Sequence, residues 1–124
     1  MTSENIPRRN RLLPERHGTT STVDIGGKRV YFQVNNYPNG KPGEVFIRID
    51  KEGSELRVYD IVAIAISIGL QYGIPVEIFI NKFKHQKMEP AGFTSNPDIP
   101  NAESIIDYLA KWLEMLYCER ETTT

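Results

Sequence analysis

The sequence predicts an α+β fold in which a three-stranded antiparallel sheet packs against three helices. In the first half, apolar and polar residues alternate with the period of two that half-buried strands show. Two consecutive glycines, Gly26 and Gly27, interrupt this alternation where a two-residue hairpin turn needs positive φ angles. In the second half the apolar residues change to helical spacing. Strands that come first and helices that follow indicate segregated α+β architecture rather than a parallel α/β sheet.

Three strands are expected in the first half. Residues 19–25 form the first strand, and residues 28–36 form its partner across the glycine turn. A stretch rich in proline, asparagine and glycine at 37–43 ends the second strand, and residues 44–50 form the third. A β-hairpin plus a third strand is the simplest connection.

Three helices are expected after the strands. The first has Ser54 as N-cap and runs to about Tyr72, with Gly73 as the residue that ends it. The second covers residues 76–86, and the third runs from about residue 100 to residue 118. The expected core contains Val30, Phe32, Val45, Ile47, Ile64, Ile68, Phe79, Ile106, Leu109 and Leu113.

The run from Ile61 to Leu70 is almost wholly apolar, which implies a helix buried on several sides. It is too short to span a membrane, which takes about 20 apolar residues. A small sheet and three strongly apolar helices leave more apolar surface than 124 residues cover easily, so we expect a homo-oligomer.

Composition and charge exclude several classes of function. The 15 basic and 16 acidic residues leave a net charge of −1, so no general field favours nucleic acid or an anionic membrane. The single cysteine, Cys118, excludes an internal disulfide and a multi-cysteine zinc site. No signal peptide is visible, and we expect a cytoplasmic protein.

The chain is expected to have one domain. Residues 19–118 form it, residues 1–18 form a basic extended arm, and residues 119–124 form a polar tail. The arm carries four arginines that could grip a phosphate or an acidic partner, the alternative being a solvated tail: Arg8, Arg9, Arg11 and Arg16.

The long polar loop before the last helix carries a family signal. It begins at His85 and reads HQKMEPAGFTSNPDIPNAESIIDY, and three shorter stretches precede it: GKPGEVFI, KEGS and LQYGIP. Each stretch is weak alone, but their ordered combination is specific. With them, residues 8–114 resemble the C-terminal domain, called TSCPD, of adenosylcobalamin-dependent (class II) ribonucleotide reductases.

The resemblance implies a link to reductases but not their reaction. Those enzymes form a radical on a cysteine and use a cysteine pair as reductant inside a large α/β barrel. This chain has one cysteine and is several times too short for the barrel. In its Thr-Ser-Asn-Pro-Asp stretch, Asn96 stands where the family's loop motif has cysteine. We therefore expect no catalysis by this chain alone and no cofactor bound by it.

A phosphate-bearing ligand such as a nucleotide is expected where the third strand meets the first helix. Lys51 supplies a charge there, and Gly53 and Ser54 lie where free backbone N–H groups bind anions. The proline-stiffened loop 87–101 would form a second wall with Phe93, Thr94, Ser95, Asn96 and Asp98. A capped turn and a rigid connector are the structural alternatives.

No metal site is predicted. His85 with Glu89 and Asp98 could be drawn as a metal or acid–base site, but the group lacks the spacing of known metal motifs. His17 is expected to be solvated.

Two classes of function remain. In the first, the chain is a free-standing accessory or regulatory module that binds nucleotide, a reductase catalytic chain, or both. In the second, it is an independent protein that binds or sequesters a nucleotide or a nucleotide-derived signal, for which a phage origin is considered. A neighbouring gene for a cysteine-rich reductase chain favours the first, and a homo-oligomer with ligand at its subunit interface favours the second.

Overall fold

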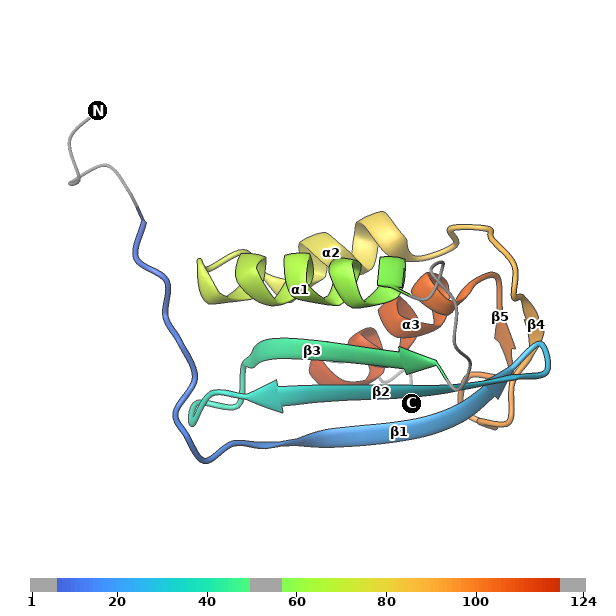
Figure 1. The fold of residues 1–124 in the computed structure, drawn as a ribbon, viewed down its shortest axis with the longest axis horizontal. Helices are drawn as coiled ribbons and strands as arrows, with labels where there is room; N and C mark the ends of the chain where they lie inside the picture. The colour runs from blue at the N-terminus through green and yellow to red at the C-terminus, as the bar shows by residue number, and fades with distance from the viewer. Residues whose placement is uncertain (1–6, 50–56, 119–124) are drawn as a thin grey trace, which may run out of the picture.

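The computed structural model describes residues 7–49 and 57–118 and confirms the α+β fold (Figure 1). The expectations for Lys51, Gly53 and Ser54 lie outside the described residues. The elements in chain order are β1 (His17–Ile25), β2 (Lys28–Asn36), β3 (Pro42–Ile49), α1 (Arg57–Gln71), α2 (Val76–Phe83), β4 (Gly92–Phe93), β5 (Asn101–Ala102) and α3 (Ile105–Tyr117).

The three long strands form one antiparallel sheet in the order β1-β2-β3. The turn lies at Gly26 and Gly27 as predicted, with φ angles of 54° and 87° that side chains seldom permit. The register follows from this turn, because Ile25 pairs with Lys28 at the closed end of the hairpin. Every other residue of β2 therefore faces the core, including Val30, Phe32 and Val34.

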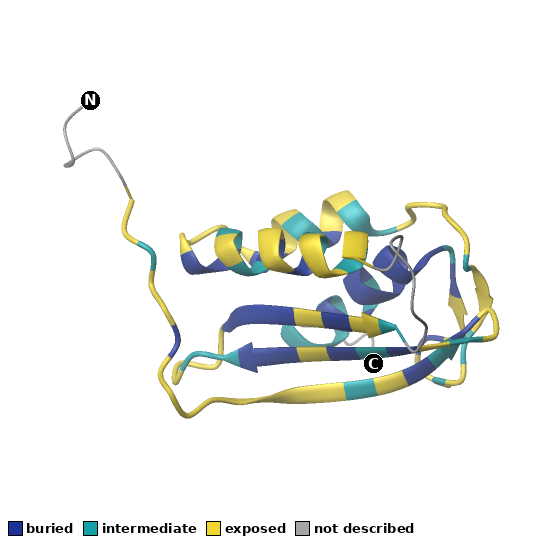
Figure 2. Ribbon diagram, in the orientation of Figure 1, coloured by how far each residue is buried: buried dark blue, intermediate teal, exposed yellow. Residues whose placement is uncertain are grey.

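The main core lies between this face of the sheet and α3. The Phe32 ring stacks on Tyr108 with centroids 5.1 Å apart and tilts against Trp112 at 5.9 Å. Both α3 residues are almost fully buried, and Leu109 between them is completely so. Figure 2 shows the dark, buried α3 behind the sheet, so α3 is the central helix of the domain.

Helix α1 runs alongside β3, the edge strand (Figure 1). The Ser67 hydroxyl lies between the helix and the strand. It accepts a hydrogen bond from the Val45 N–H at 2.8 Å and lies 3.1 Å from the Val45 carbonyl oxygen. Ala63, Ile66 and Leu70 point inward and are buried. The helix thus covers backbone groups that an open sheet edge would leave unpaired.

The position of α1 corrects part of the predicted core. Ile64 and Ile68 are 52% and 39% exposed, although they were expected inside. The prediction was wrong because α1 is apolar on more than one side while the small domain covers only the side that faces β3. Phe79 is half-buried against the core, and the other seven expected core residues are buried.

The segment between α2 and α3 is more structured than predicted. It forms the two-residue ribbon of β4 and β5, and the Gly26 N–H donates to the Phe93 carbonyl at 3.1 Å. Helix α2 ends at Phe83, and α3 begins later than expected, with Ser104 as N-cap accepting from the Asp107 N–H. None of the described helices is both long and apolar enough to cross a bilayer.

Candidate docking surface and ligand loop

A cleft of about 610 Å³ opens where β3 ends and α1 begins. Its described lining is mainly apolar and includes Ile49, Tyr59 and Pro90, with Lys28 and Glu89 as the charged members. The cleft therefore adjoins the region where the ligand was predicted. The loop contributes residues 88–91 to the described lining, ahead of the Thr94–Asp98 stretch named from the sequence.

Most polar groups of that stretch are used to fold the loop. The Thr94 hydroxyl bonds the Ile99 carbonyl, and the Ser95 hydroxyl accepts from the Asp24 N–H at 2.8 Å. The Asn96 side chain donates to the Tyr108 hydroxyl at 2.9 Å and accepts from the Asp98 N–H at 3.0 Å. These contacts support the structural alternative, in which the loop is a rigid connector.

Three of the predicted loop residues are exposed: Phe93, Ser95 and Asp98. Phe93 is 81% exposed. An aromatic ring this exposed is available to stack or to dock. The structure therefore leaves Phe93 as the loop's most accessible recognition group.

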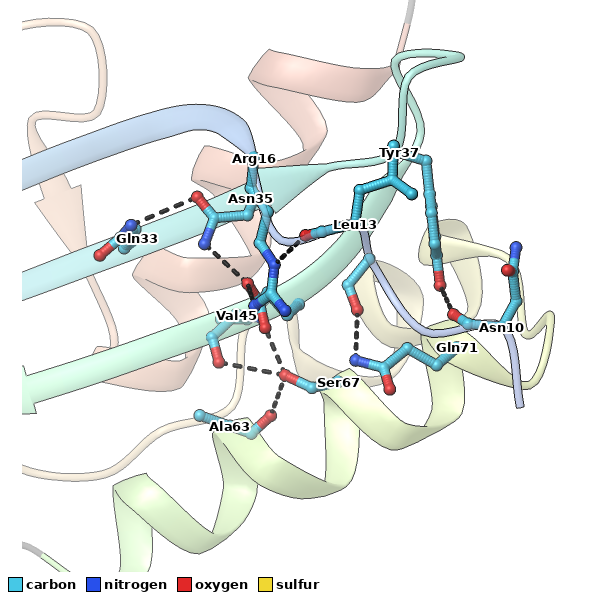
Figure 3. A network of polar contacts seen from close by, with 12 residues as sticks. Asn10, Leu13, Arg16, Gln33, Asn35, Tyr37, Val45, Ala63, Ser67 and Gln71 are labelled. Atoms are coloured by element: carbon cyan, nitrogen blue, oxygen red, sulfur yellow. Dashed lines mark hydrogen bonds and ion pairs between the residues drawn. The ribbon is translucent and has the colours of Figure 1, made fainter.

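The arm packs on the domain from Arg9 onward. The Asn10 N–H donates to the Gln71 carbonyl at 2.8 Å, and the Asn10 carbonyl accepts from the Tyr37 hydroxyl. Leu12 is buried at 8% exposure. Figure 3 shows this stretch lying across the end of α1. Residues 9–12 are consequently part of the packed structure.

Two of the four arginines are bound within the chain. Arg16 pairs with Glu44 at 2.7 Å, and Glu44 also accepts from the Asn35 amide at 2.8 Å (Figure 3). Arg9 donates to the Gln71 side chain at 2.6 Å. Arg8 and Arg11 are exposed and remain the arm's accessible charges.

The outer side of α1 is an apolar surface. Seven large apolar side chains, here called the α1–α2 face, are 39–63% exposed: Val58, Ile61, Ile64, Ile68, Tyr72, Ile74 and Ile78. The five on or just after α1, at positions 58, 61, 64, 68 and 72, fall within about 120° of the helix circumference. Residues 61–76 contain no charged side chain. Figure 2 shows this side of α1 exposed along most of its length.

A contiguous exposed apolar surface marks an interaction site more often than a solvated face. Apolar residues that are scattered singly over a surface carry no such meaning, but these residues form a continuous stripe. The sequence already contained an indication that one side of this helix would be exposed. Two apolar stripes on opposite sides of one helix cannot both be covered by a three-stranded sheet. One of them had to face outward.

The start of α3 holds a buried carboxylate. Asp107 is fully buried and accepts from the N–H groups of His85 at 2.6 Å and Glu103 at 2.9 Å, and from Lys111 Nζ at 2.8 Å. Burial would raise the pKa of Asp107, but these bonds and the Lys111 charge hold it below its usual value. His85 thus lies beside Glu103 and Asp107, rather than with the Glu89 and Asp98 considered from the sequence.

The single thiol has no feature of an activated nucleophile. Burial raises the pKa of Cys118, and the carboxylates of Glu77 and Glu114 raise it further. A thiol with a raised pKa carries less thiolate at neutral pH.

Residues 7–117 match the TSCPD domain family. The chain is 46% identical over 112 residues to a vitamin B12-dependent ribonucleotide reductase of Rhodopirellula baltica, covering 90% of this chain and 11% of that protein. It is 42% identical over 120 residues to the protein of the same name from Streptantibioticus cattleyicolor, covering 96% and 20%.

A third relative of that name, from Agrobacterium fabrum, is 41% identical over 114 residues, covering 90% of this chain and 9% of the relative. The chain thus spans 9–20% of the length of these curated relatives. The solved structures contain no significant match. The match over almost all of the described residues shows that the chain belongs to the TSCPD domain family found in vitamin B12-dependent ribonucleotide reductases.

Proposed function

We propose that this chain is an interaction module of a ribonucleotide reductase, without catalysis of its own, that docks on a reductase catalytic chain through the α1–α2 face. The observation that carries the proposal is the exposed apolar stripe on α1, which contains no charged residue from residue 61 onward. The relatives support it, because in them a domain of this family occurs within a much longer reductase.

The stripe has the properties of an interface centre. Interface cores are depleted in charged residues and are more apolar than the rest of a protein surface. Fully burying an exposed isoleucine or valine contributes about 1.5–3 kcal/mol, and a half-exposed one about half as much, so several of these side chains must be buried together to offset the cost of association. The α1 helix is also a rigid support, since Ala63, Ile66 and Leu70 fix its inner side.

A binding measurement tests the proposal directly. The chain is immobilised, and the catalytic chain of a vitamin B12-dependent ribonucleotide reductase from the same organism is passed over it. The double variant Ile61→Asp/Ile64→Asp places two charges at the centre of the face and is expected to weaken binding at least about a hundredfold, since each desolvated charge costs more than a kilocalorie.

A matched control comes from the open face of the sheet. Phe46 is 47% exposed, close to the 52% of Ile64, and it lies on β3 rather than among the seven residues of the α1–α2 face. Phe46→Asp is expected to bind as the parent does. Equal binding by the parent and the double variant, or no binding by any of them, contradicts docking through α1.

A second candidate function is nucleotide binding, which the cleft beside the start of α1 favours. Its volume of about 610 Å³ suits a ligand of nucleotide size, and Lys28 offers a positive charge at its wall. Lys51→Ala is expected to weaken nucleotide binding in calorimetry about ten- to a hundredfold, because it removes a charged partner of the phosphate. Unchanged binding would move the phosphate site elsewhere, with the arginine arm as the next place to test.

A further inference from the structure

We infer that His85, Glu103 and Asp107 form a binding site for one first-row transition-metal dication of the Zn²⁺ type. The three residues come from different segments: His85 follows α2, Glu103 follows β5, and Asp107 lies in the first turn of α3. One ligand atom from each lies within 4.8 Å of the other two.

The distances between the ligand atoms suit a small cation. His85 Nδ1 lies 3.3 Å from Glu103 Oε2 and 4.0 Å from Asp107 Oδ1. Ligands bound tetrahedrally at about 2.0–2.1 Å are separated by about 3.3–3.4 Å. The first distance already has this value. The distance from His85 Nδ1 to Asp107 Oδ1 would shorten to this value after a small rotation of the His85 ring, which is 64% exposed and therefore has room to turn.

Glu103 has an acceptor that the described residues leave unused. Its Oε2 atom is buried and accepts no hydrogen bond, although it lies 3.3 Å from His85 Nδ1. The two atoms are close without the geometry of a bond. A buried carboxylate oxygen without a partner costs free energy, and a cation placed between the two atoms would satisfy both.

Asp107 is held in place for the third contact. Its Oδ2 accepts from Glu103 N–H and Lys111. Among the described residues, its Oδ1 accepts only from His85 N–H, which leaves one lone pair for a cation. Such outer hydrogen bonds orient carboxylate ligands at metal sites. The exposed sides of His85 and Glu103 leave the remaining coordination positions to water.

The donor set selects among metals. One imidazole nitrogen with two carboxylates suits Zn²⁺ and its neighbours, whereas Mg²⁺ prefers oxygen ligands in octahedral geometry. Lys111 opposes the cation, because its ammonium lies 2.8 Å from Asp107 Oδ2. A positive side chain this close lowers the affinity of the site for a metal dication. Removing its charge should therefore tighten metal binding, a result that is not expected if the three residues form only a structural ion-pair network.

The experiment is calorimetry of the metal-free, tag-free full chain with ZnCl₂ and with MgCl₂. We expect one Zn²⁺ per chain and no heat from Mg²⁺. His85→Ala and Glu103→Gln each remove one ligand and are expected to weaken Zn²⁺ binding at least about tenfold to a hundredfold. Lys111→Gln removes the opposing charge and is expected to tighten binding on the order of tenfold.

His17→Ala is the matched control, because His17 is the other histidine of the chain and lies in β1. It is expected to bind Zn²⁺ as the parent does. All variants are checked by circular dichroism, and Co²⁺ absorption in the parent gives a second readout of the ligand geometry. No Zn²⁺ binding by the parent, unchanged affinity in His85→Ala, or weaker binding in Lys111→Gln would each overturn the inference.

Discussion

Asp107 connects three segments through one carboxylate. It receives hydrogen bonds from the backbone N–H groups of His85 and Glu103 and from the Lys111 ammonium, while its own N–H is capped by Ser104. The spacing of Ser104 and Asp107 is typical of a helix start, but nothing in the sequence indicates that the carboxylate also fixes His85.

Asp107→Asn is therefore expected to lower the free energy of unfolding by about 1.5–3 kcal/mol at pH 7, because a hydrogen bond to a charged group is replaced by a weaker one. The measurement is urea denaturation followed by circular dichroism. Glu89→Gln is the control, because Glu89 is exposed and is expected to change stability little.

The pH dependence of this effect has a definite sign. The pKa of Asp107 is lowered in the folded protein, so its contribution is complete above the unfolded value of about 3.9 and is lost as the pH falls through the folded value. Below about pH 4 the parent should lose stability more steeply than Asp107→Asn does. Parallel curves for the two proteins would show that the carboxylate does not stabilise the fold.

Cys118→Ser is expected to keep the fold and any ligand binding. The thiol has a raised pKa and is the sole cysteine, so it has no partner for redox work within the chain. Thermal melts and the Zn²⁺ titration check this. Loss of either property in the serine variant would assign a role to the thiol.

At the scale of the elements, the contact between α1 and β3 determines what the domain exposes. Ser67 accepts from the Val45 N–H, and its single hydrogen serves either the Val45 or the Ala63 carbonyl. This one hydroxyl ties the helix to the edge of the sheet. The apolar inner stripe of α1 then packs there, and the outer stripe stays exposed.

Ser67→Ala is expected to lower the free energy of unfolding by about 1–3 kcal/mol, because the Val45 N–H is left without a partner in a buried position. The matched control is Ser95→Ala, which removes a similar bond to the Asp24 N–H at an exposed site, where water replaces the hydroxyl. Equal losses in the two variants would contradict the importance of burial at the α1–β3 contact.

At the scale of the whole molecule, the α1–α2 face predicts self-association in the absence of a partner. Two copies can pair their stripes without charge repulsion, since residues 61–76 carry no charge. We expect a dimer, or a higher even-numbered state, in light scattering at micromolar concentration. Ile61→Asp/Ile64→Asp should give a monomer, and Phe46→Asp should not. A sharp monomer mass for the parent would count against pairing through this face.

The sequence by itself determined the strands, the pairing of the first two across the glycine turn, and the family. Alternation and the Gly26–Gly27 turn fix these strands locally, because the turn type sets which residues pair and the period of two sets which face is apolar. The ordered motifs of residues 40–108 identified the TSCPD family for a similar reason, since they are a property of the chain and require no knowledge of packing.

Only the tertiary structure decided which side of α1 is covered and what the polar loop does. A helix with apolar stripes on two opposite sides gives no sequence signal for which of them is buried, and Ile64 and Ile68 were therefore assigned to the core wrongly. Likewise, Thr94, Ser95 and Asn96 offered ligand groups in sequence, but their partners come from β1, α3 and the loop itself. Contacts between segments far apart in the chain form only on folding, so they lie beyond what local patterns encode.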